Sequence, residues 1–205
     1  MARRSDPHAS VRERLLAAAD ALFYEHGVNT VGIDRVIERA GVAKASLYSA
    51  FGSKDELIRA YLVGRHAVRK ARMTRMLEQY PTPRERVLGV FDVLGELFAE
   101  PGFHGCAFVN ASAEASPDSP IQEAAAEYRA WVHTLILDLV RETGAADPEQ
   151  LARQLVLLYD GAAISARMER NPGVAVLART AAAALLDAAT RSDDDPASPP
   201  SPGVT

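Results

Sequence analysis

Residues 41–54 carry the side chains best suited to binding chemistry, and they read Gly-Val-Ala-Lys-Ala-Ser-Leu-Tyr-Ser-Ala-Phe-Gly-Ser-Lys. On a helical wheel with about 100° per residue, Leu47 and Phe51 fall on one side, whereas Ala45 and Ser49 fall on the opposite side. We expect the apolar side to pack inward. The outward side then presents small side chains, hydroxyl groups and ammonium groups, which suit hydrogen bonding and contact with phosphate.

This pattern predicts contacts with double-stranded DNA, divided between bases and phosphates. The predicted contacts to base edges come from Lys44, Ala45 and Ser49. The predicted contacts to phosphate oxygens come from Ser46 and Tyr48. Lys54 starts the next helix, where its charge adds to an anion-attracting N-terminus. The competing interpretation is an ordinary short helix of a bundle, which gives exposed Tyr48 and Lys54 no packing purpose.

The flanking elements are typical of a helix-turn-helix, whose second helix enters the major groove. A first helix is predicted from an N-cap at Ser10, with a capping-box partner at Glu13, to about His26. A second helix covers about residues 33–40 and ends at Gly41. The recognition helix follows and covers roughly residues 44–50.

A long helix should connect this module with the rest of the chain. Ser53 is its predicted N-cap, with Glu56 at the capping-box position, and it runs to about residue 79. Its predicted inward residues are Leu57, Tyr61, Val68 and Met76. We expect this helix to be the mechanical connection between the two parts of the protein.

The sequence around the predicted turn resembles the TetR family of bacterial regulators. The resemblance rests on residues 40–48, Ala-Gly-Val-Ala-Lys-Ala-Ser-Leu-Tyr, then Phe51, then Ser-Lys-Asp-Glu-Leu at 53–57, and it covers about residues 10–60. It implies a homodimer that binds a near-palindromic operator, usually as a repressor, and is released by a small ligand. It also implies phosphate contacts from Tyr48 and Lys54.

One departure from the family pattern concerns the start of the second helix. The family often has Thr or Ser there, whose hydroxyl caps the helix and contacts phosphate, but this chain has Val31 and Gly32. Thr30 lies just upstream. Glycine caps a helix less well than a hydroxyl residue does. Three residues are therefore candidates for the lost phosphate contact: Thr30, Arg35 and Arg39.

Charge separates the two parts of the 205-residue chain. Residues 1–75 hold 14 Lys and Arg against 8 Asp and Glu, a balance of +6, and the remaining residues hold 9 against 19, a balance of −10. A basic module joined to an acidic remainder favours one polyanion-binding part. One cysteine and no apolar run of transmembrane length predict a cytoplasmic protein without membrane contact.

The remaining pattern predicts an all-α fold of about nine helices, with no strand of useful length. Further helices are expected at 84–99, within 103–116, and at 121–143, 148–170 and 174–189. The predicted domains are a DNA-binding domain at 1–52, completed by the start of the fourth helix, and a ligand-binding and dimerisation domain at 53–190. Residues 191–205 are predicted to be a disordered tail, and residues 1–8 a loose basic arm.

Two sets of residues are predicted to regulate the DNA-binding part. Aromatic and histidine side chains of the middle helices are candidates for a ligand pocket: Phe91, Phe98, Phe103, Phe108, Tyr128, Trp131, His133 and Tyr159. Apolar residues of the last two helices are candidates for a four-helix dimer interface: Leu151, Leu155, Leu158, Ala162, Ala166, Leu177, Ala181, Ala184 and Leu185. Ordinary intrachain packing is the alternative for both sets.

Cys106 leaves two interpretations open. It is either a small buried apolar residue or a sensor of electrophiles or oxidants, and the segment around it resembles one in a TetR subgroup with cysteine sensors. An activator of the same family is the other alternative to a repressor. No phosphate-cradling glycine loop, metal-binding Glu-x-x-His pair or Ser/His/Asp set indicates an enzyme, a cofactor or a metal. The expected partners are an operator DNA, a second copy of the chain and an unknown small effector.

Overall fold

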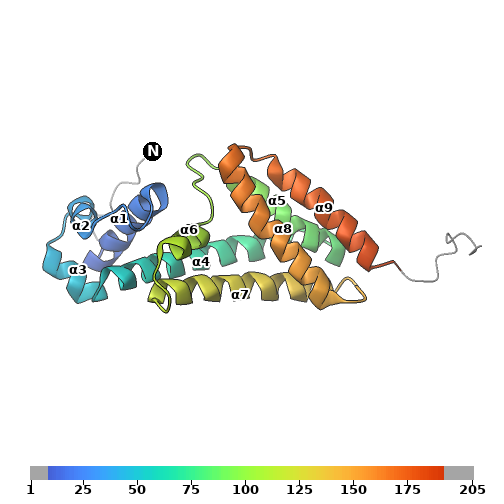
Figure 1. Ribbon diagram of the computed structural model, residues 1–205, viewed down its shortest axis with the longest axis horizontal. Coiled ribbons are helices and arrows are strands. Elements are labelled where there is room, and N and C mark those ends of the chain that lie inside the picture. Colours follow the sequence, from blue (N-terminus) through green and yellow to red (C-terminus); the bar gives the residue numbers. More distant parts are fainter. Residues whose placement is uncertain (1–8, 192–205) are drawn as a thin grey trace, which may run out of the picture.

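The structure is a computed structural model that describes residues 9–191, and within this range the chain forms nine α-helices and no strand. The helices are α1 (Val11–His26), α2 (Ile33–Ala40), α3 (Lys44–Phe51), α4 (Lys54–Leu77), α5 (Pro83–Phe98), α6 (Ala107–Glu114), α7 (Pro120–Arg141), α8 (Pro148–Glu169) and α9 (Val174–Ala189). The molecule is elongated, with α1–α3 at one end and α5, α8 and α9 towards the other (Figure 1). The predicted fold class is confirmed, and the helix boundaries differ from the predicted ones by a few residues at most.

The first three helices and the start of α4 share one small core. Leu15, Val36, Leu47 and Leu57 come from the four helices in turn, and each is completely buried. Leu47 is the one fully buried side chain of α3. Burial of this residue therefore fixes which side of α3 faces outward.

Local chemistry sets the turn that separates α2 from α3. Gly41 adopts a left-handed conformation with φ 63°, and its N–H donates to the carbonyl of Glu38. The next N–H, that of Val42, donates to the carbonyl of Ile37 at 3.1 Å. Glycine adopts this conformation without the steric cost that a Cβ brings, so the chain can reverse here and start a new helix three residues later, at Lys44.

Helix α4 is 24 residues long and belongs to both ends of the molecule. Its N-cap is Ser53, whose hydroxyl accepts a hydrogen bond from the N–H of Glu56 at 3.1 Å, as predicted. Further along, Arg65 binds Asp20 of α1 through a hydrogen bond of 2.7 Å and lies 3.6 Å from the ring centroid of Tyr24. These contacts fasten α4 to α1 beyond the point where the small core ends.

The inward stripe of α4 differs from the predicted one in the middle of the helix. Val68 was expected to face inward, but it is 72% exposed. The side chain that faces α6 and α7 in this region is instead His66, whose ring lies near those of Phe108 and Tyr128. A polar inward stripe carries no hydrophobic periodicity, so the apolar pattern alone could not locate it.

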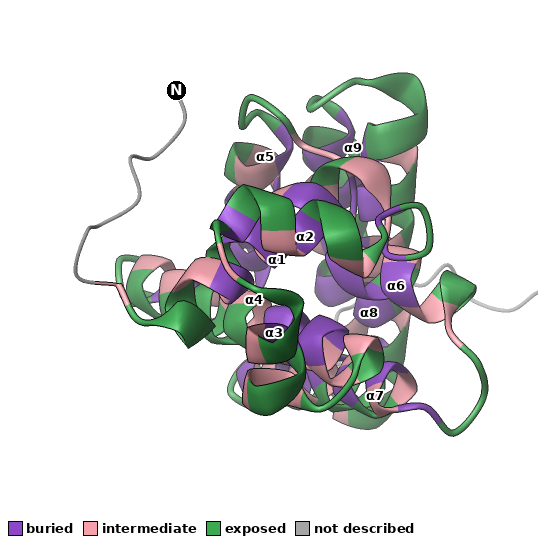
Figure 2. Cartoon of the chain, turned by 90° about the vertical axis from the view of Figure 1, so that its left-hand side faces the viewer, coloured by how far each residue is buried: buried purple, intermediate pink, exposed green. Residues whose placement is uncertain are grey.

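Helices α5, α7, α8 and α9 pack with α4 into the larger core. The closest helix pairs are α5 with α9, α7 with α8, α8 with α9, and α4 with α7. Their fully buried side chains include Phe91, Leu94, Ile136 and Leu155. In an end-on view, buried residues line the contacts between helices while exposed residues cover the outer faces (Figure 2).

Within residues 9–191, no helix has the length and apolar character needed to cross a membrane.

The predicted basic arm at residues 1–8 lies outside the described residues, as does the predicted disordered tail at 191–205 apart from Arg191.

Replacement of Leu47 by Ala is expected to lower the free energy of unfolding by about 3 kcal/mol, because the side chain is fully buried and a cavity is left behind. Ser49→Ala, on the exposed side of the same helix, is the control and should change the value by less than about 0.5 kcal/mol. Urea unfolding followed by circular dichroism measures both. Equal stability of the two variants would contradict the placement of α3.

Candidate DNA-contacting surface and ligand pocket

The exposed side of α3 matches the side predicted to contact DNA. Lys44, Ala45 and Ser49 are exposed, and Tyr48 is 45% exposed although it is a large aromatic residue. Ser46 and Lys54 are half-buried at the flanks. The structure therefore places all six side chains around one surface at the end of the molecule.

Lys44 has an acidic neighbour on the preceding helix. Its Nζ donates a hydrogen bond of 3.1 Å to Asp34 Oδ1, and this bond together with the negative charge of Asp34 raises the pKa of Lys44. The side chain is exposed, so solvent weakens this pair and the ammonium can exchange it for another anion. Lys44 thus stays charged and available at the start of α3.

The start of α2 lacks a side-chain cap, as its sequence suggested. Gly32 is the N-cap residue and provides no side-chain hydrogen bond, and Val31 is fully buried in the core. Thr30, Arg35 and Arg39 are all exposed. Arg35 lies 2.9 Å from His26 Nε2.

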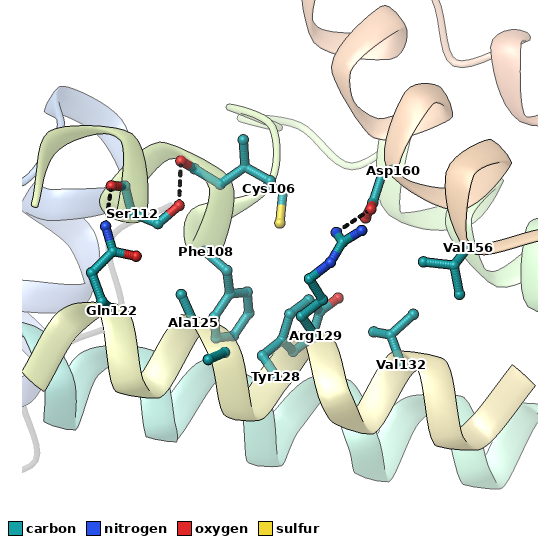
Figure 3. A pocket seen from close by; sticks show the side chains of 12 residues that line it. Cys106, Phe108, Ser112, Gln122, Ala125, Tyr128, Arg129, Val132, Val156 and Asp160 are labelled. Atoms are coloured by element: carbon teal, nitrogen blue, oxygen red, sulfur yellow. Dashed lines mark hydrogen bonds and ion pairs between the residues drawn. The ribbon is translucent and has the colours of Figure 1, made fainter. Parts of the chain in front are cut away.

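A pocket of about 280 Å³ lies between α6, α7 and α8 (Figure 3). Its wall combines apolar side chains with a thiol, a hydroxyl, an amide and one ion pair, and consists of Cys106, Phe108, Val109, Ser112, Gln122, Ala125, Ala126, Tyr128, Arg129, Val132, Val156 and Asp160. Arg129 and Asp160 form the ion pair across the pocket. A mostly apolar wall with a few polar groups is typical of small-molecule sites.

Two of the eight predicted ligand residues, Phe108 and Tyr128, line this pocket. Their rings stack in parallel with centroids 3.7 Å apart. Tyr159 is not part of the pocket wall, but its hydroxyl is hydrogen-bonded to that of Tyr128 at 2.8 Å. Trp131 lies 5.6 Å from the Tyr128 ring by centroids, in the same aromatic cluster but outside the pocket wall.

The other predicted ligand residues need correction. Phe91 and Phe98 are buried in the core to 1% and 5% exposure, and Phe103 packs on Phe98 with ring centroids 5.0 Å apart. His133 is half-buried and is not part of the pocket wall. Helical spacing of aromatic residues marks any inward-facing side, and here it marked the core between α5 and its neighbours.

The rings of Phe108, Tyr128 and Trp131 form an aromatic cluster, and His66 of α4 belongs to it. The sequence did not indicate His66 as a member. Its ring centroid lies 5.1 Å from that of Trp131 and 5.5 Å from that of Tyr128. Burial, and to a lesser extent the charge of Lys70, lowers the pKa of His66. The imidazole is therefore neutral near pH 7, and its buried Nε2 has no hydrogen-bond partner.

The thiol of Cys106 lies in the pocket wall at the N-cap of α6. Burial raises its pKa, although the N–H groups of Val109 and Phe108 and the charge of Arg69 oppose the rise. The thiol form therefore predominates near neutral pH, and this form is the poorer nucleophile.

Helix α6 and the loop before it connect the pocket with the DNA-contacting end. The hydroxyl of Tyr24 in α1 donates to the carbonyl of Gly105 and accepts from the N–H of His104, both at 3.1 Å. At the other end of α6, the backbone N–H of Asn29 donates to Glu114 at 2.8 Å. Cys106 and Phe108 of the pocket wall lie in the chain between these two contacts. A displacement of the pocket wall therefore occurs close to the hydrogen bonds that join this segment to α1 and to the loop before α2.

The dimer-interface prediction needs correction for α8. Leu151, Leu155, Ala162 and Ala166 are 0–4% exposed because they form the chain's own core with its neighbouring helices. Leu158 is half-buried. On α9, Leu177 is 69% exposed, Ala181 and Ala184 are exposed, and Leu185 is half-buried.

Both helices instead show an exposed stripe with helical spacing. On α8 it comprises Leu157, Gly161, Ile164 and Met168, and on α9 it comprises Leu177, Ala181, Ala184 and Ala188. Leu157 is 67% exposed and Met168 79%. We call these eight residues the α8–α9 face.

Within residues 9–191, no group of three or more His, Cys, Asp or Glu residues is placed to hold a metal ion.

Comparisons with known proteins agree on one family. Residues 15–61 match the family model described as bacterial regulatory proteins, tetR family. A TetR-family transcriptional regulator from Streptomyces coelicolor has 33% identity and a TM-score of 0.83, and the match covers 88% of this chain and 96% of that one. A putative TetR regulator from Streptomyces avermitilis has 36% identity and a TM-score of 0.80, with 88% and 98% covered. The transcriptional repressor NemR of Escherichia coli is 28% identical over 170 residues, which are 78% of this chain and 85% of NemR.

The single cysteine gives a direct test of the pocket wall. Cys106 is expected to react with iodoacetamide more slowly in the folded protein than in urea, because burial raises its pKa and leaves less thiolate at a given pH. The folded-state rate should keep rising as the pH passes the ordinary thiol range. Mass spectrometry of the alkylated chain measures it. A rate that is already constant below pH 7 would show an activated thiolate instead.

Proposed function

The chain belongs to the TetR family of bacterial transcriptional regulators, and we propose that it is a homodimeric repressor that leaves a near-palindromic operator when a small molecule enters the pocket between α6, α7 and α8. The observation that carries this proposal is the exposed side of α3, where small and basic residues surround an exposed Tyr48 over the buried Leu47. The family consists of DNA-binding regulators and not of enzymes. A location in the cytoplasm, where the operator is accessible, is part of the same proposal.

The DNA contacts follow from the surface that α3 presents. Ala45 and Ser49 are small enough to let the helix approach base edges closely, and Lys44 can exchange Asp34 for an acceptor on a base. Tyr48, Ser46 and Lys54 lie where phosphate oxygens would pass beside the groove. Thr30, Arg35 and Arg39 extend this positive and polar edge to α2. Two turns of one helix reach only a few base pairs, which is why a second copy is needed.

The α8–α9 face is the proposed dimer interface. A continuous stripe of exposed apolar residues on two neighbouring helices is typical of an interaction surface. Within it, the small residues Gly161, Ala181 and Ala184 allow helix axes to approach closely. Two helices from each protomer would pack as a four-helix bundle around a twofold axis. The face lies on the part of the molecule away from α3 (Figure 1), so the recognition helices remain free to meet DNA.

Release from DNA requires that the ligand bind better to a conformation that does not fit the operator. Two connections from the pocket region to α3 support this mechanism. One is α4, which packs on α7 and begins three residues after α3. The other is α6 together with the loop before it: this segment supplies pocket residues, its loop contacts α1 through Gly105, and Glu114 of α6 contacts the loop before α2.

A cysteine-based sensor of electrophiles is the second candidate, favoured by the position of Cys106 in the pocket wall. Its raised pKa argues against fast reaction, and the alkylation experiment separates the two mechanisms. An activating role on the same operator is distinguished by a reporter gene. Repression predicts higher reporter expression when the regulator is deleted.

The lysines of the chain allow a controlled test of DNA binding. Lys54→Ala is expected to weaken the retardation of DNA from the gene's own upstream region, and to reduce the slope of log K against log salt by about 2 per dimer, because each protomer loses one phosphate contact. Lys70→Ala removes an exposed lysine about 24 Å further along α4 and should change neither value. No retardation by the wild-type protein at low salt would contradict the proposed function.

The dimer is tested by charges on the α8–α9 face. The double variant Met168→Asp and Leu177→Asp should sediment as a monomer, because two charges per protomer would be buried in the interface. Val68→Asp is the control, since Val68 is equally exposed but lies on α4. A monomeric wild type, or a dimeric double variant, would rule out this face as the interface.

A further inference from the structure

A hydrogen bond between α6 and α7 fixes which end of the Gln122 amide is free. The amide nitrogen of Gln122 donates to the backbone carbonyl of Ser112 at 2.8 Å. A carbonyl can only accept, so the nitrogen must be the end that meets Ser112, and the amide oxygen is the other end. Figure 3 shows the nitrogen turned to Ser112 and the oxygen turned away from it. Among the hydrogen bonds of residues 9–191, none uses this oxygen.

Two other polar groups of the pocket wall are also acceptors. The hydroxyl of Ser112 donates its one hydrogen to the carbonyl of Val109 at 3.2 Å, so its oxygen can only accept from a ligand. The carboxylate of Asp160 only accepts, and its bond with Arg129 leaves lone pairs over. Three side chains of the wall thus offer free acceptor sites.

Free donors are fewer among the lining residues that the structure describes. The hydroxyl of Tyr128 shares a hydrogen bond of 2.8 Å with that of Tyr159. Arg129 has further N–H groups, but its side chain is 60% exposed, so water reaches them. The second N–H of Gln122 and the weak donor of the Cys106 thiol remain. The wall therefore favours a ligand that donates a hydrogen bond over one that only accepts.

The charges of the pocket wall balance. Arg129 and Asp160 are the charged side chains among the described residues that line it, and they form an ion pair across the pocket. A charged ligand would have to separate this pair or enter without an opposite charge to bind, and both cost free energy in a partly buried site. An uncharged ligand leaves the pair intact.

The volume and the apolar part of the wall indicate the body of the ligand. A cavity of about 150 Å³ accommodates benzene, so the 280 Å³ available here leave room for about two rings. The rings of Phe108 and Tyr128 lie parallel with centroids 3.7 Å apart, and Val132 and Val156 are buried beside the pocket. Flat aromatic bodies pack well against such side chains.

We propose that the effector is an uncharged aromatic molecule of about two rings, whose hydroxyl or N–H group donates a hydrogen bond to the amide oxygen of Gln122. This inference rests on the proposed function, because it names the class of ligand for the same pocket. The ring system packs against Phe108 and Tyr128, and the Arg129–Asp160 pair stays in place.

Gln122 connects this ligand with the DNA-contacting end. Its amide holds the last turn of α6 through the carbonyl of Ser112. Two residues further along α6, Glu114 accepts a hydrogen bond of 2.8 Å from the N–H of Asn29 in the loop before α2. A ligand bound to Gln122 therefore acts on the end of α6 that holds this loop.

Three pairs of two-ring probes, each a donor with its methylated form, test the proposal: 2-naphthol with 2-methoxynaphthalene, 4-phenylphenol with 4-methoxybiphenyl, and indole with 1-methylindole. Calorimetry on the full chain measures affinity, and retardation of upstream DNA measures release. In at least one pair the donor should bind about fivefold or more tightly than its methylated form and release the DNA. The anion 2-naphthoate, which only accepts, should bind more weakly than 2-naphthol.

Methylation also adds bulk, and a variant separates this effect from the hydrogen bond. Gln122→Met keeps the length of the side chain but removes the amide oxygen. It should weaken binding of the preferred donor by about fivefold and leave the affinity for its methylated form within about twofold, so the difference between the two probes disappears. Retardation of DNA by this variant without ligand shows that it folds.

Gln150→Met is the matched control, because it makes the same change at an exposed residue of α8 outside the pocket wall. It should leave both affinities unchanged.

The inference is overturned by equal affinities within every pair, by a donor preference that persists in Gln122→Met, or by tighter binding of 2-naphthoate than of 2-naphthol. Binding of no probe, or binding that leaves the DNA retarded, overturns it as well. These failures leave the proposed function intact if the wild type retards DNA. If the wild type does not retard DNA, the proposed function itself fails.

Discussion

A single continuous helix shared by two cores is the constraint on which the rest of the structure depends. Helix α4 spans 24 residues, a length of about 36 Å. Its first turns bury Leu57 and Leu62 against the DNA-contacting end, and its last turns bury Met73 and Leu77 in the larger core. Because α4 is one continuous helix, a shift of its last turns in the larger core also moves its first turns at the DNA-contacting end.

Helix α6 is a second connection between the pocket and the DNA-contacting end. It is short, with eight residues, and it buries Ala107, Phe108 and Ala111 between the longer helices. Yet the loop before it binds Tyr24, and its last residue, Glu114, binds Asn29 of the DNA-contacting part. A small helix that carries pocket residues and holds these contacts can pass on a change that leaves the main core intact.

The sequence predicted the local structure well because local chemistry determines it. Ser10 and Ser53 cap their helices where predicted, and Gly41 ends α2 in the left-handed conformation that glycine favours. The buried side of α3 could be assigned because its one large apolar stripe contains Leu47. All of these features depend on residues within one or two helical turns.

The regulatory part was predicted less well because several helices there carry more than one apolar stripe. Leu155 and Leu157 lie on different sides of α8, and only the packing of α7 and α9 decides which one is buried. Besides Phe108 and Tyr128, the pocket wall contains small and polar residues such as Ala125, Gln122 and Asp160, which no aromatic pattern could indicate.

The central claim is that two copies of α3 read two inverted sites on DNA. Selection of bound fragments from genomic DNA, followed by footprinting, tests it most directly. The account predicts a protected region near the gene that contains two inverted half-sites, with centres about one helical turn, or a multiple of it, apart. Enrichment of no fragment, or protection of a single unrepeated site, would contradict it.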